Sequence, residues 1–355
     1  MSGTSGVDEA TPVAAQAAVA QDRAARRRIE LLLRFRELGI VLAIAALMLV
    51  TALYNSRFVQ TQSIRDILLN TAVYAVLAAG QAVVVITRNI DLSVSSVLGL
   101  SAFAVATTLA SHPGTPIVLA FALGILVGAA CGLVNGVLVR FGNIPALVVT
   151  LGTLYVFRGV DYLWAGSEQV TADEFPPAFI ELGTARVAGV PLLAVIAIAV
   201  VVATGVWLRS FRSGRELYAM GSNPEAARLA GVPTGRRLLT AFVLSGALAG
   251  LAGVLFATRY AVVDATSGTG YELTVVAAVV VGGVAVFGGS GTVYGAALGA
   301  LLLSVIQSAL PVLRVAQFWQ QAIAGALILL AIGTDRVVAG RMSAALRRRD
   351  SHHGG

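Results

Sequence analysis

Long apolar runs alternate with short polar segments along almost the whole chain. Each run carries few or no charged residues, and most reach the roughly 17–25 residues that a helix needs to cross the apolar core of a bilayer. The ten runs are residues 38–54, 67–87, 92–111, 116–139, 144–157, 187–208, 238–258, 273–287, 292–313 and 318–334. The pattern predicts an all-α fold, a polytopic membrane bundle of about ten transmembrane helices.

Two of the runs, 144–157 and 273–287, are shorter than a helix that crosses the bilayer. In transport proteins, short or glycine-interrupted spans often mark irregular backbone beside the solute path. The alternative is an ordinary span whose charged end reaches out to the membrane surface. The sequence leaves both interpretations open.

The composition supports the membrane assignment and excludes a soluble domain. The chain has 355 residues, of which 57% are hydrophobic and 12% are charged, and its mean hydropathy is +0.85. Soluble domains carry about 25% charged residues, because their surfaces face water. The single cysteine, Cys131, has no partner within the chain, so we expect a packing residue and no disulfide.

The basic residues predict the orientation of the bundle. All 25 are arginines. If both termini are cytoplasmic, 19 of the 25 fall in inside segments and 6 fall outside, as the positive-inside rule requires. Nucleic-acid binding is disfavoured, because no basic face interleaved with aromatic residues exists. We therefore expect a multi-pass inner-membrane protein with cytoplasmic N- and C-termini.

Three parts follow from this pattern. Residues 1–37 are expected to form a cytoplasmic extension that is disordered at first and then a basic amphipathic helix over 21–37. Residues 38–335 form the transmembrane domain, and residues 336–355 form a basic cytoplasmic tail. Three connections within the transmembrane domain are long, namely 158–187 and 259–272 outside and 209–237 inside.

Glycines recur at four-residue spacing in three of the runs. They are Gly124, Gly128, Gly132 and Gly136, then Gly246 and Gly250, then Gly295 and Gly299. On a helix, such positions line one side and let another backbone approach closely. We favour packing within the chain over a dimer contact. A pattern of helix, polar break and helix also occurs twice, in 76–102 and in 274–301, as in transporters built from duplicated units.

Enzymatic functions are disfavoured by the residues present. His112 lies in a turn before a proline and His352 and His353 lie in the tail, so none can serve a buried nucleophile. No His, Cys and acidic cluster has the spacing of metal ligands. The glycines of 288–291 lack the lysine of a phosphate-binding loop and predict a tight cytoplasmic turn. We expect no enzyme, no metal and no cofactor.

The run interiors contain no ionisable residue that could bind a coupling ion, which favours an external motor. Asp91 and Asp161 are placed at the ends of spans. Neutral polar side chains within the runs suit an uncharged, hydroxyl-rich solute, or simply hydrogen bonding between helices. They are Asn70, Gln81, Asn135, Thr150, Thr153, Tyr155, Ser304 and Gln307.

The inside segment SGRELYAMGSNPEAARLAGVPTGRR (213–237) carries the strongest local signals. Asn223 is a good N-cap, Pro224 fits the first helical position, and Glu225 complements the positive end of a helix. These residues predict a short helix over 225–230 that stops at Gly231. A short capped helix facing the cytoplasm between two spans suits a docking element for a motor subunit, although a structural cap of the loop is the alternative.

Four segments resemble the sugar-type permease subunits of bacterial ATP-binding-cassette importers, the group that takes ribose, rhamnose and autoinducer-2. They are ITRNIDLSVSSVLGLSA (86–102), GLVNGVLVRFGNIPALVVTLGTLYVFRG (132–159), GRELYAMGSNPEAARLAGV (214–232) and YELTVVAAVVVGGVAVFGGSGTVYGAALGALLLSVIQ (271–307). The resemblance covers about residues 64–335. Asn89 and Ser95 stand where the family usually has glycine, and TRN-ID resembles the rhamnose and autoinducer-2 branch more than the ribose branch.

The resemblance implies a bacterial inner-membrane permease with three kinds of partner: a cytoplasmic ATPase, a periplasmic or lipid-anchored sugar-binding protein, and a second permease chain, identical or a sister subunit. It implies an ATPase-coupling loop at Gly214, Arg215, Tyr218, Asn223, Pro224, Glu225, Ala226, Ala227 and Gly231. The candidate translocation path is Gln81, Asn89, Asp91, Ser93, Asn135, Thr150, Thr153 and Tyr155. Two rivals stay open, a branched-chain amino-acid permease of similar layout and an ion-coupled secondary transporter.

Overall fold

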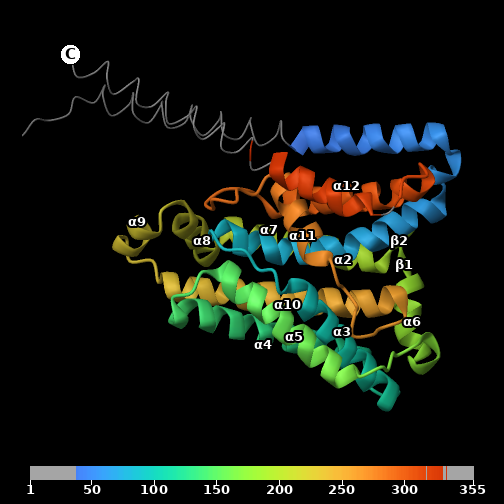
Figure 1. Cartoon of the computed structure of the whole chain (residues 1–355), viewed down its shortest axis with the longest axis horizontal. Helices are drawn as coiled ribbons and strands as arrows, with labels where there is room; N and C mark the ends of the chain where they lie inside the picture. The colour runs from blue at the N-terminus through green and yellow to red at the C-terminus, as the bar shows by residue number, and fades with distance from the viewer. Residues whose placement is uncertain (1–36, 317, 331–332, 334–355) are drawn as a thin grey trace, which may run out of the picture.

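The computed structural model describes residues 37–316, 318–330 and 333. Within these residues, eight helices are long and apolar enough to cross a membrane. They are Glu37–Tyr54, α2 (Thr61–Ile86), α3 (Val94–Ser111), α4 (Ile117–Gly142), α5 (Ala146–Ala165), α7 (Leu192–Ser210), α10 (Thr234–Tyr260) and α12 (Val293–Val312). Two apolar helices are shorter, α11 (Tyr271–Val281) and Trp319–Leu330. The predicted polytopic helical bundle is confirmed (Figure 1).

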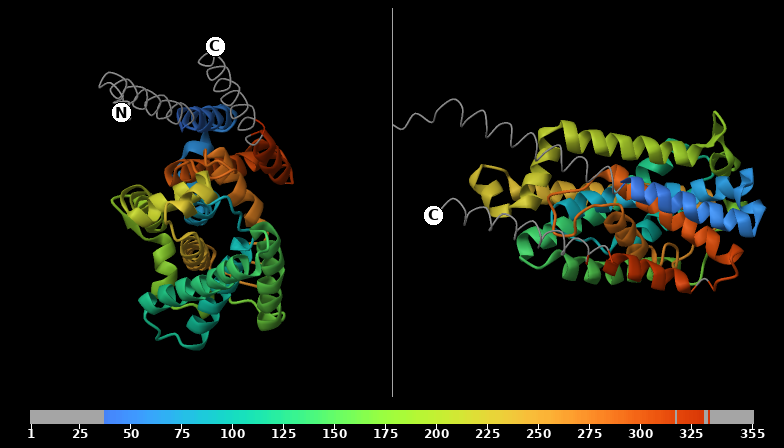
Figure 2. Two further views of the ribbon diagram at one scale, coloured as in Figure 1. Left: turned by 90° about the vertical axis from the view of Figure 1, so that its left-hand side faces the viewer. Right: turned by 90° about the horizontal axis from the view of Figure 1, so that it is seen from above.

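The remaining elements are short and lie at the two ends of the bundle. They are η1 (Ser56–Val59), η2 (Ala172–Glu174), α6 (Pro177–Thr184), β1 (Arg186–Val187), β2 (Val190–Pro191), α8 (Arg212–Ser222) and α9 (Pro224–Leu229). Strands β1 and β2 pair antiparallel, with Arg186 opposite Pro191 and Val187 opposite Val190. In Figures 1 and 2, α8 and α9 project from one end of the bundle, whereas α6 and the hairpin lie at the other.

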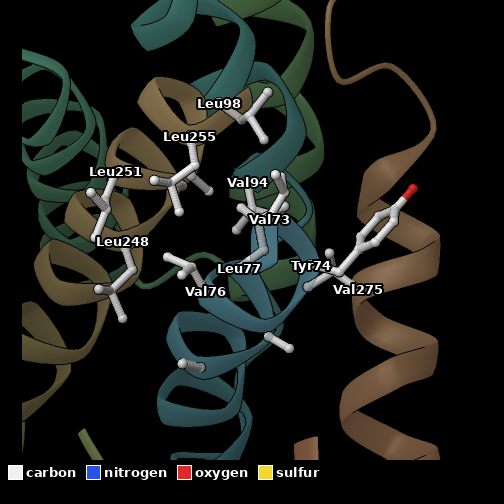
Figure 3. Close-up of a cluster of buried hydrophobic side chains, with 14 of the residues drawn as sticks. Val73, Tyr74, Val76, Leu77, Val94, Leu98, Leu248, Leu251, Leu255 and Val275 are labelled. Atoms are coloured by element: carbon white, nitrogen blue, oxygen red, sulfur yellow. The ribbon is translucent and has the colours of Figure 1, made fainter. Parts of the chain in front are cut away.

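Helix α2 lies at the centre of the bundle because it is apolar on every side. In its most apolar 18-residue stretch 89% of the residues are buried, compared with 17% for the helix Glu37–Tyr54. Its valines and leucines pack against α3, α10 and α11, as Figure 3 shows for Val76, Leu77, Leu98 and Leu255. The outer helices expose their apolar residues, which suits a surface that faces lipid.

Helices α4 and α10 approach each other closely where their glycines at four-residue spacing face each other. A Cβ added at Gly128 would collide with the carbonyl oxygen of Gly246 and would lie 2.7 Å from the nitrogen of Gly250. Gly132 meets the carbonyl of Phe242 in the same way. Gly299 of the third pattern faces α11. The prediction that these glycines serve packing within the chain is confirmed.

The two short runs, 144–157 and 273–287, form different structures. Run 273–287 forms only the short helix α11, because the backbone leaves the helix at Gly282 and passes through four glycines with positive φ before α12. This run therefore has irregular backbone, the first of the two interpretations that the sequence left open. Run 144–157 does not: α5 continues to Ala165, so residues 158–165, expected in an external loop, are helical.

The two polar breaks of the repeated helix–break–helix pattern meet at one end of the bundle. The first connects α2 to α3 and the second connects α11 to α12. The backbone N–H of Gly289 in the second break donates to the carbonyl of Ile86 at the start of the first, at 2.9 Å. The glycines at 288–291 form the turn that the sequence predicts, with positive φ at Gly288, Gly289 and Gly291.

Several predictions fall on residues outside those that the structure describes. They are the N-terminal extension with its amphipathic segment, the basic tail, and the last residues of run 318–334. Cys131 is buried in α4 with a free thiol, as expected of a packing residue. Among the described residues, no group of three or more His, Cys, Asp or Glu side chains could hold a metal ion.

Candidate functional site

The predicted docking element has the conformation that its caps imply. The side chain of Asn223 accepts a hydrogen bond from the backbone N–H of Ala226 at 3.0 Å, and Pro224 occupies the first turn of α9. Gly231 has φ +78°, a conformation that favours glycine, and ends the helix beyond Ala230. The predicted short helix is confirmed, within one residue at each end, and its docking role stays a prediction.

Helix α9 presents most of its side chains to solvent at the tip of the bundle (Figure 1). Leu229 is 81% exposed, and Glu225 and Ala226 are also exposed. Ala227 is the exception, because it is buried against the rest of the protein.

Helix α8 holds α9 on the bundle through an ion-pair cluster. Glu216 accepts hydrogen bonds from the guanidinium nitrogens of Arg237 at 2.5 Å and of Arg212 at 2.7 Å. These bonds lower the pKa of Glu216, so the carboxylate stays ionised and the cluster stays formed at neutral pH. Since Arg237 belongs to α10, the cluster links α8, which leads into α9, directly to a spanning helix.

Close backbone packing fixes the other side of α8. Gly214 has no room for a side chain, because a Cβ there would collide with the backbone of Trp207 and Leu208. The hydroxyl of Tyr218 donates to the carbonyl of Gly291 at 2.9 Å, and burial raises the pKa of this phenol to about 12. Arg215 donates to the carbonyl of Ser210 at the end of α7. These three predicted site residues therefore fix the position of α8, which leads into α9.

Five of the eight predicted path residues meet in the interior, around the break between α2 and α3, where Ser245, which was not among the predicted residues, joins them. Asp91 accepts from the hydroxyl of Ser93 at 2.6 Å, and Ser93 in turn accepts from the amide of Asn135 in α4 at 2.7 Å. The hydroxyl of Thr153 in α5 donates to Asn135 at 2.7 Å. We call Gln81, Asp91, Ser93, Asn135, Thr153 and Ser245 the Asp91 network.

Two further helices complete the network. The hydroxyl of Ser245 in α10 lies 3.4 Å from the second carboxylate oxygen of Asp91. The Gln81 side chain of α2, with its amide turned so that both neighbours are satisfied, donates to the Asp91 carbonyl at 2.9 Å and accepts from the Asp91 N–H at 3.3 Å. Side chains from four helices, α2, α4, α5 and α10, thus converge on one short segment of irregular backbone.

The Asp91 network is enclosed. Its side chains are 0–7% exposed, so in this conformation they hydrogen-bond one another across helices and do not line an open passage. Thr150 is buried nearby and donates to the carbonyl of Ile90 at 3.1 Å. Asn89 is partly exposed at the edge of the break, whereas Tyr155 is 69% exposed on the outer face of α5, apart from the others.

Two charged residues that the sequence interpretation placed outside, at the start of the connection 158–187, are buried and form an ion pair. Arg158 and Asp161 lie on α5, three residues apart, and they are 9% and 0% exposed. Arg158 donates to the carbonyls of Ala265 at 2.8 Å and Ser267 at 2.9 Å, and its Nη1 lies 3.7 Å from Asp161. In the sequence, this buried pair could have been recognised from two opposite charges three positions apart, directly after the apolar run 144–157.

The family model and the relatives that match the chain are all permease components of transport systems. A family model described as "Branched-chain amino acid transport system / permease component" matches residues 63–332. The chain is 40% identical to the autoinducer 2 import system permease protein LsrC of Enterobacter sp. (strain 638), covering 89% of this chain and 90% of the relative. It is 39% identical to the LsrC of Klebsiella pneumoniae and 36% identical to that of Escherichia coli K12, each match covering 88–90% of both proteins. No solved structure matches the chain.

Proposed function

The chain belongs to the family described as the permease component of branched-chain amino acid transport systems, and from that premise we propose that it forms the pore of an ATP-binding-cassette importer for a sugar-like solute. It is a multi-pass protein of the bacterial inner membrane. In the proposed importer, a separate ATPase supplies the energy, and this chain supplies a path that opens alternately to each side of the membrane.

The names of the relatives support a sugar-like solute of the autoinducer-2, rhamnose or ribose class. Relatives at 35–40% identity over nearly the whole chain carry the name of an autoinducer 2 import permease. The description of the family model names branched-chain amino acids, which keeps that solute class as the second candidate.

The observation that carries the proposal is α9. A six-residue helix with an N-cap, a proline at its first turn and an exposed leucine stands clear of the bundle at its tip. The ion-pair cluster of Glu216 and the packing at Gly214 hold its base to spanning helices. An element that is exposed at one end and rigidly anchored at the other suits the transfer of force from a docked ATPase to the bundle.

The proposed assembly contains two permease chains, identical or a sister pair, with the path at their interface. A periplasmic or lipid-anchored binding protein delivers the solute at the end of the bundle that carries α6 and the β hairpin. Two ATPases dock on α9 at the other end, which the arginine distribution places in the cytoplasm. Closure of the ATPases on ATP would then switch the path between its two openings.

The proposal is tested by deleting the gene in the bacterium that carries it and returning the wild-type gene. We expect the deletion to abolish uptake of autoinducer-2, rhamnose or ribose and to leave leucine uptake unchanged. Loss of leucine uptake alone would instead identify the branched-chain class. Uptake by the purified chain alone in vesicles, driven by a proton or sodium gradient, would replace the proposal with a secondary transporter.

Docking on α9 predicts the behaviour of Glu225→Arg combined with Leu229→Glu. Both side chains are exposed, so the double variant should insert and fold normally, whereas a change at the buried Ala227 would disturb α9 itself. We expect the variant to lose the ATP hydrolysis that co-purifies with the tagged chain from membranes, and to lose uptake, because reversed charge and a buried carboxylate oppose docking.

Glu168→Arg is the matched control for that variant. Glu168 is exposed in the connection after α5, at the end of the bundle away from α9, and its substitution makes the same charge reversal as Glu225→Arg. The control should retain the co-purifying ATP hydrolysis. Retention of the same hydrolysis by the Glu225→Arg, Leu229→Glu variant would refute the assignment of α9.

A further inference from the structure

We propose that Arg88 is a positioning residue, which couples movement of the docking element to the Asp91 network. Arg88 lies in the break between α2 and α3, one residue beyond the C-cap of α2, and it is separated from α9 by more than 130 positions in sequence. The inference rests on the proposed function, because it assigns the route by which a docked ATPase would act on the path.

The side chain of Arg88 binds the end of α8. Its Nε donates to the carbonyl of Gly221 and its Nη2 donates to the carbonyl of Ser222, the latter at 2.6 Å. These are the last carbonyls of a helix, which have no partner within the helix and carry its partial negative charge. Arg88 therefore caps α8 at the point where the chain turns through Asn223 into α9.

The backbone of Arg88 is held in an uncommon conformation. Its φ is +66°, in the left-handed region that non-glycine residues rarely occupy. Such a conformation persists only where the surrounding contacts determine it. Here, those contacts are the two bonds to α8 and two backbone bonds that end α2 in a left-handed turn, from the Arg88 N–H to the carbonyl of Val85 at 2.9 Å and from the Asn89 N–H to the carbonyl of Val84 at 3.3 Å. Displacement of α8 would remove the first two and let the break change conformation.

The glycine turn before α12 contacts both the break between α2 and α3 and the end of α8. A Cβ at Gly289 would lie 2.6 Å from the Cα of Ser222, and one at Gly288 would collide with the side chain of Arg88. A Cβ at Gly221 would collide with the carbonyl of Ile86. Gly221 and Gly289 therefore bring backbone atoms of the three segments into direct contact, and the Arg88 side chain packs against the turn at Gly288, so a displacement of one segment is transmitted to the others.

The inner end of the same break carries Asp91. Only two residues separate Arg88 from Asp91, whose carboxylate and backbone hold Ser93, Ser245 and Gln81. Through Ser93 the network reaches Asn135 and Thr153 on α4 and α5. A change of the backbone at Arg88 would thus disturb hydrogen bonds to four spanning helices. Among the described residues, Arg88 is the only arginine whose side chain donates hydrogen bonds to the last carbonyls of α8.

The experiment compares Arg88→Ala, Arg88→Gly and Arg88→Lys with Arg209→Ala in the uptake strain. Arg209 is an exposed arginine at the same end of the bundle, so it controls for the loss of charge. We expect Arg88→Ala to lower uptake by roughly 2- to 30-fold, the range for residues along a coupling route, and to keep the co-purifying ATP hydrolysis. Arg88→Gly, which relieves the backbone strain but lacks the guanidinium, should lose uptake as well.

Arg88→Lys keeps the charge and one donor, and should fall between wild type and Arg88→Ala. A second readout is hydrogen exchange in the purified complex with and without ATP. In the wild type, exchange within residues 87–93 should change on addition of ATP. In Arg88→Ala, that response should disappear, while the response of 223–231 remains.

Three results would overturn the inference without touching the proposed function. The first is wild-type uptake by Arg88→Ala or Arg88→Gly, and the second is no response of residues 87–93 to ATP in the wild type. The third is loss of the co-purifying ATP hydrolysis in all three Arg88 variants, which would make Arg88 part of the docking surface. Failure of the returned wild-type gene to restore uptake would count against the proposed function instead.

Discussion

Arg158→Leu is expected to destabilise the folded chain by about 3–5 kcal/mol, the usual effect of removing one partner of a buried ion pair. The substitution leaves the carboxylate of Asp161 fully buried without its only cationic neighbour among the described contacts. It also removes the donors to the carbonyls of Ala265, Ser267 and Ser95, which join the 261–270 connection and α3 to α5. The loss should appear as a lower midpoint of thermal unfolding in detergent.

Two further variants separate the charge from the packing. Arg158→Leu combined with Asp161→Leu removes both charges, so it should be more stable than Arg158→Leu alone, although three carbonyls stay without their donor. Arg259→Leu breaks the more exposed pair with Asp66, at 2.9 Å, and should lower stability by only about 0–1 kcal/mol. Equal midpoints for Arg158→Leu and Arg259→Leu would contradict the burial argument.

Gly128→Ala is expected to destabilise the chain by about 1–3 kcal/mol or more, even though it adds a single methyl group. The new Cβ would overlap the carbonyl oxygen of Gly246, a backbone atom that no rotamer change can move. Helices α4 and α10 would have to separate, and the hydrogen bonds of Asn135 and Ser245 across the Asp91 network would lengthen with them. The amount of protein in the membrane and the unfolding midpoint measure the effect.

Gly152→Ala is the matched control for this substitution. Gly152 lies on α5, and no atom comes within 4 Å of a Cβ built there. Alanine favours a helix over glycine by about 0.8–1 kcal/mol, so this variant should be as stable as wild type or more so. A loss of stability at Gly152 equal to that at Gly128 would show that packing between α4 and α10 is not the cause.

The candidate site shows which features follow from neighbouring residues in the sequence and which depend on distant ones. Asn223, Pro224 and Gly231 specify α9 through interactions within a few residues, so its limits follow from the sequence within one residue. The extent of α5 does not, because Arg158 looks like the end of a span until Ala265 and Ser267 are known to accept its hydrogen bonds. Those partners lie 107 and 109 positions away.

The sequence by itself determined the membrane bundle, its helices, the helix-packing role of the glycines, and the capped helix that projects from one end. These properties depend on neighbouring residues, on helix period and on the burial of apolar side chains, all of which can be read along the chain. The tertiary structure alone decided that the polar residues from Gln81 to Thr153 close into one network, and that Arg88 binds the end of α8. Such contacts join positions up to 154 residues apart, and they exist only because packed helices bring those positions together.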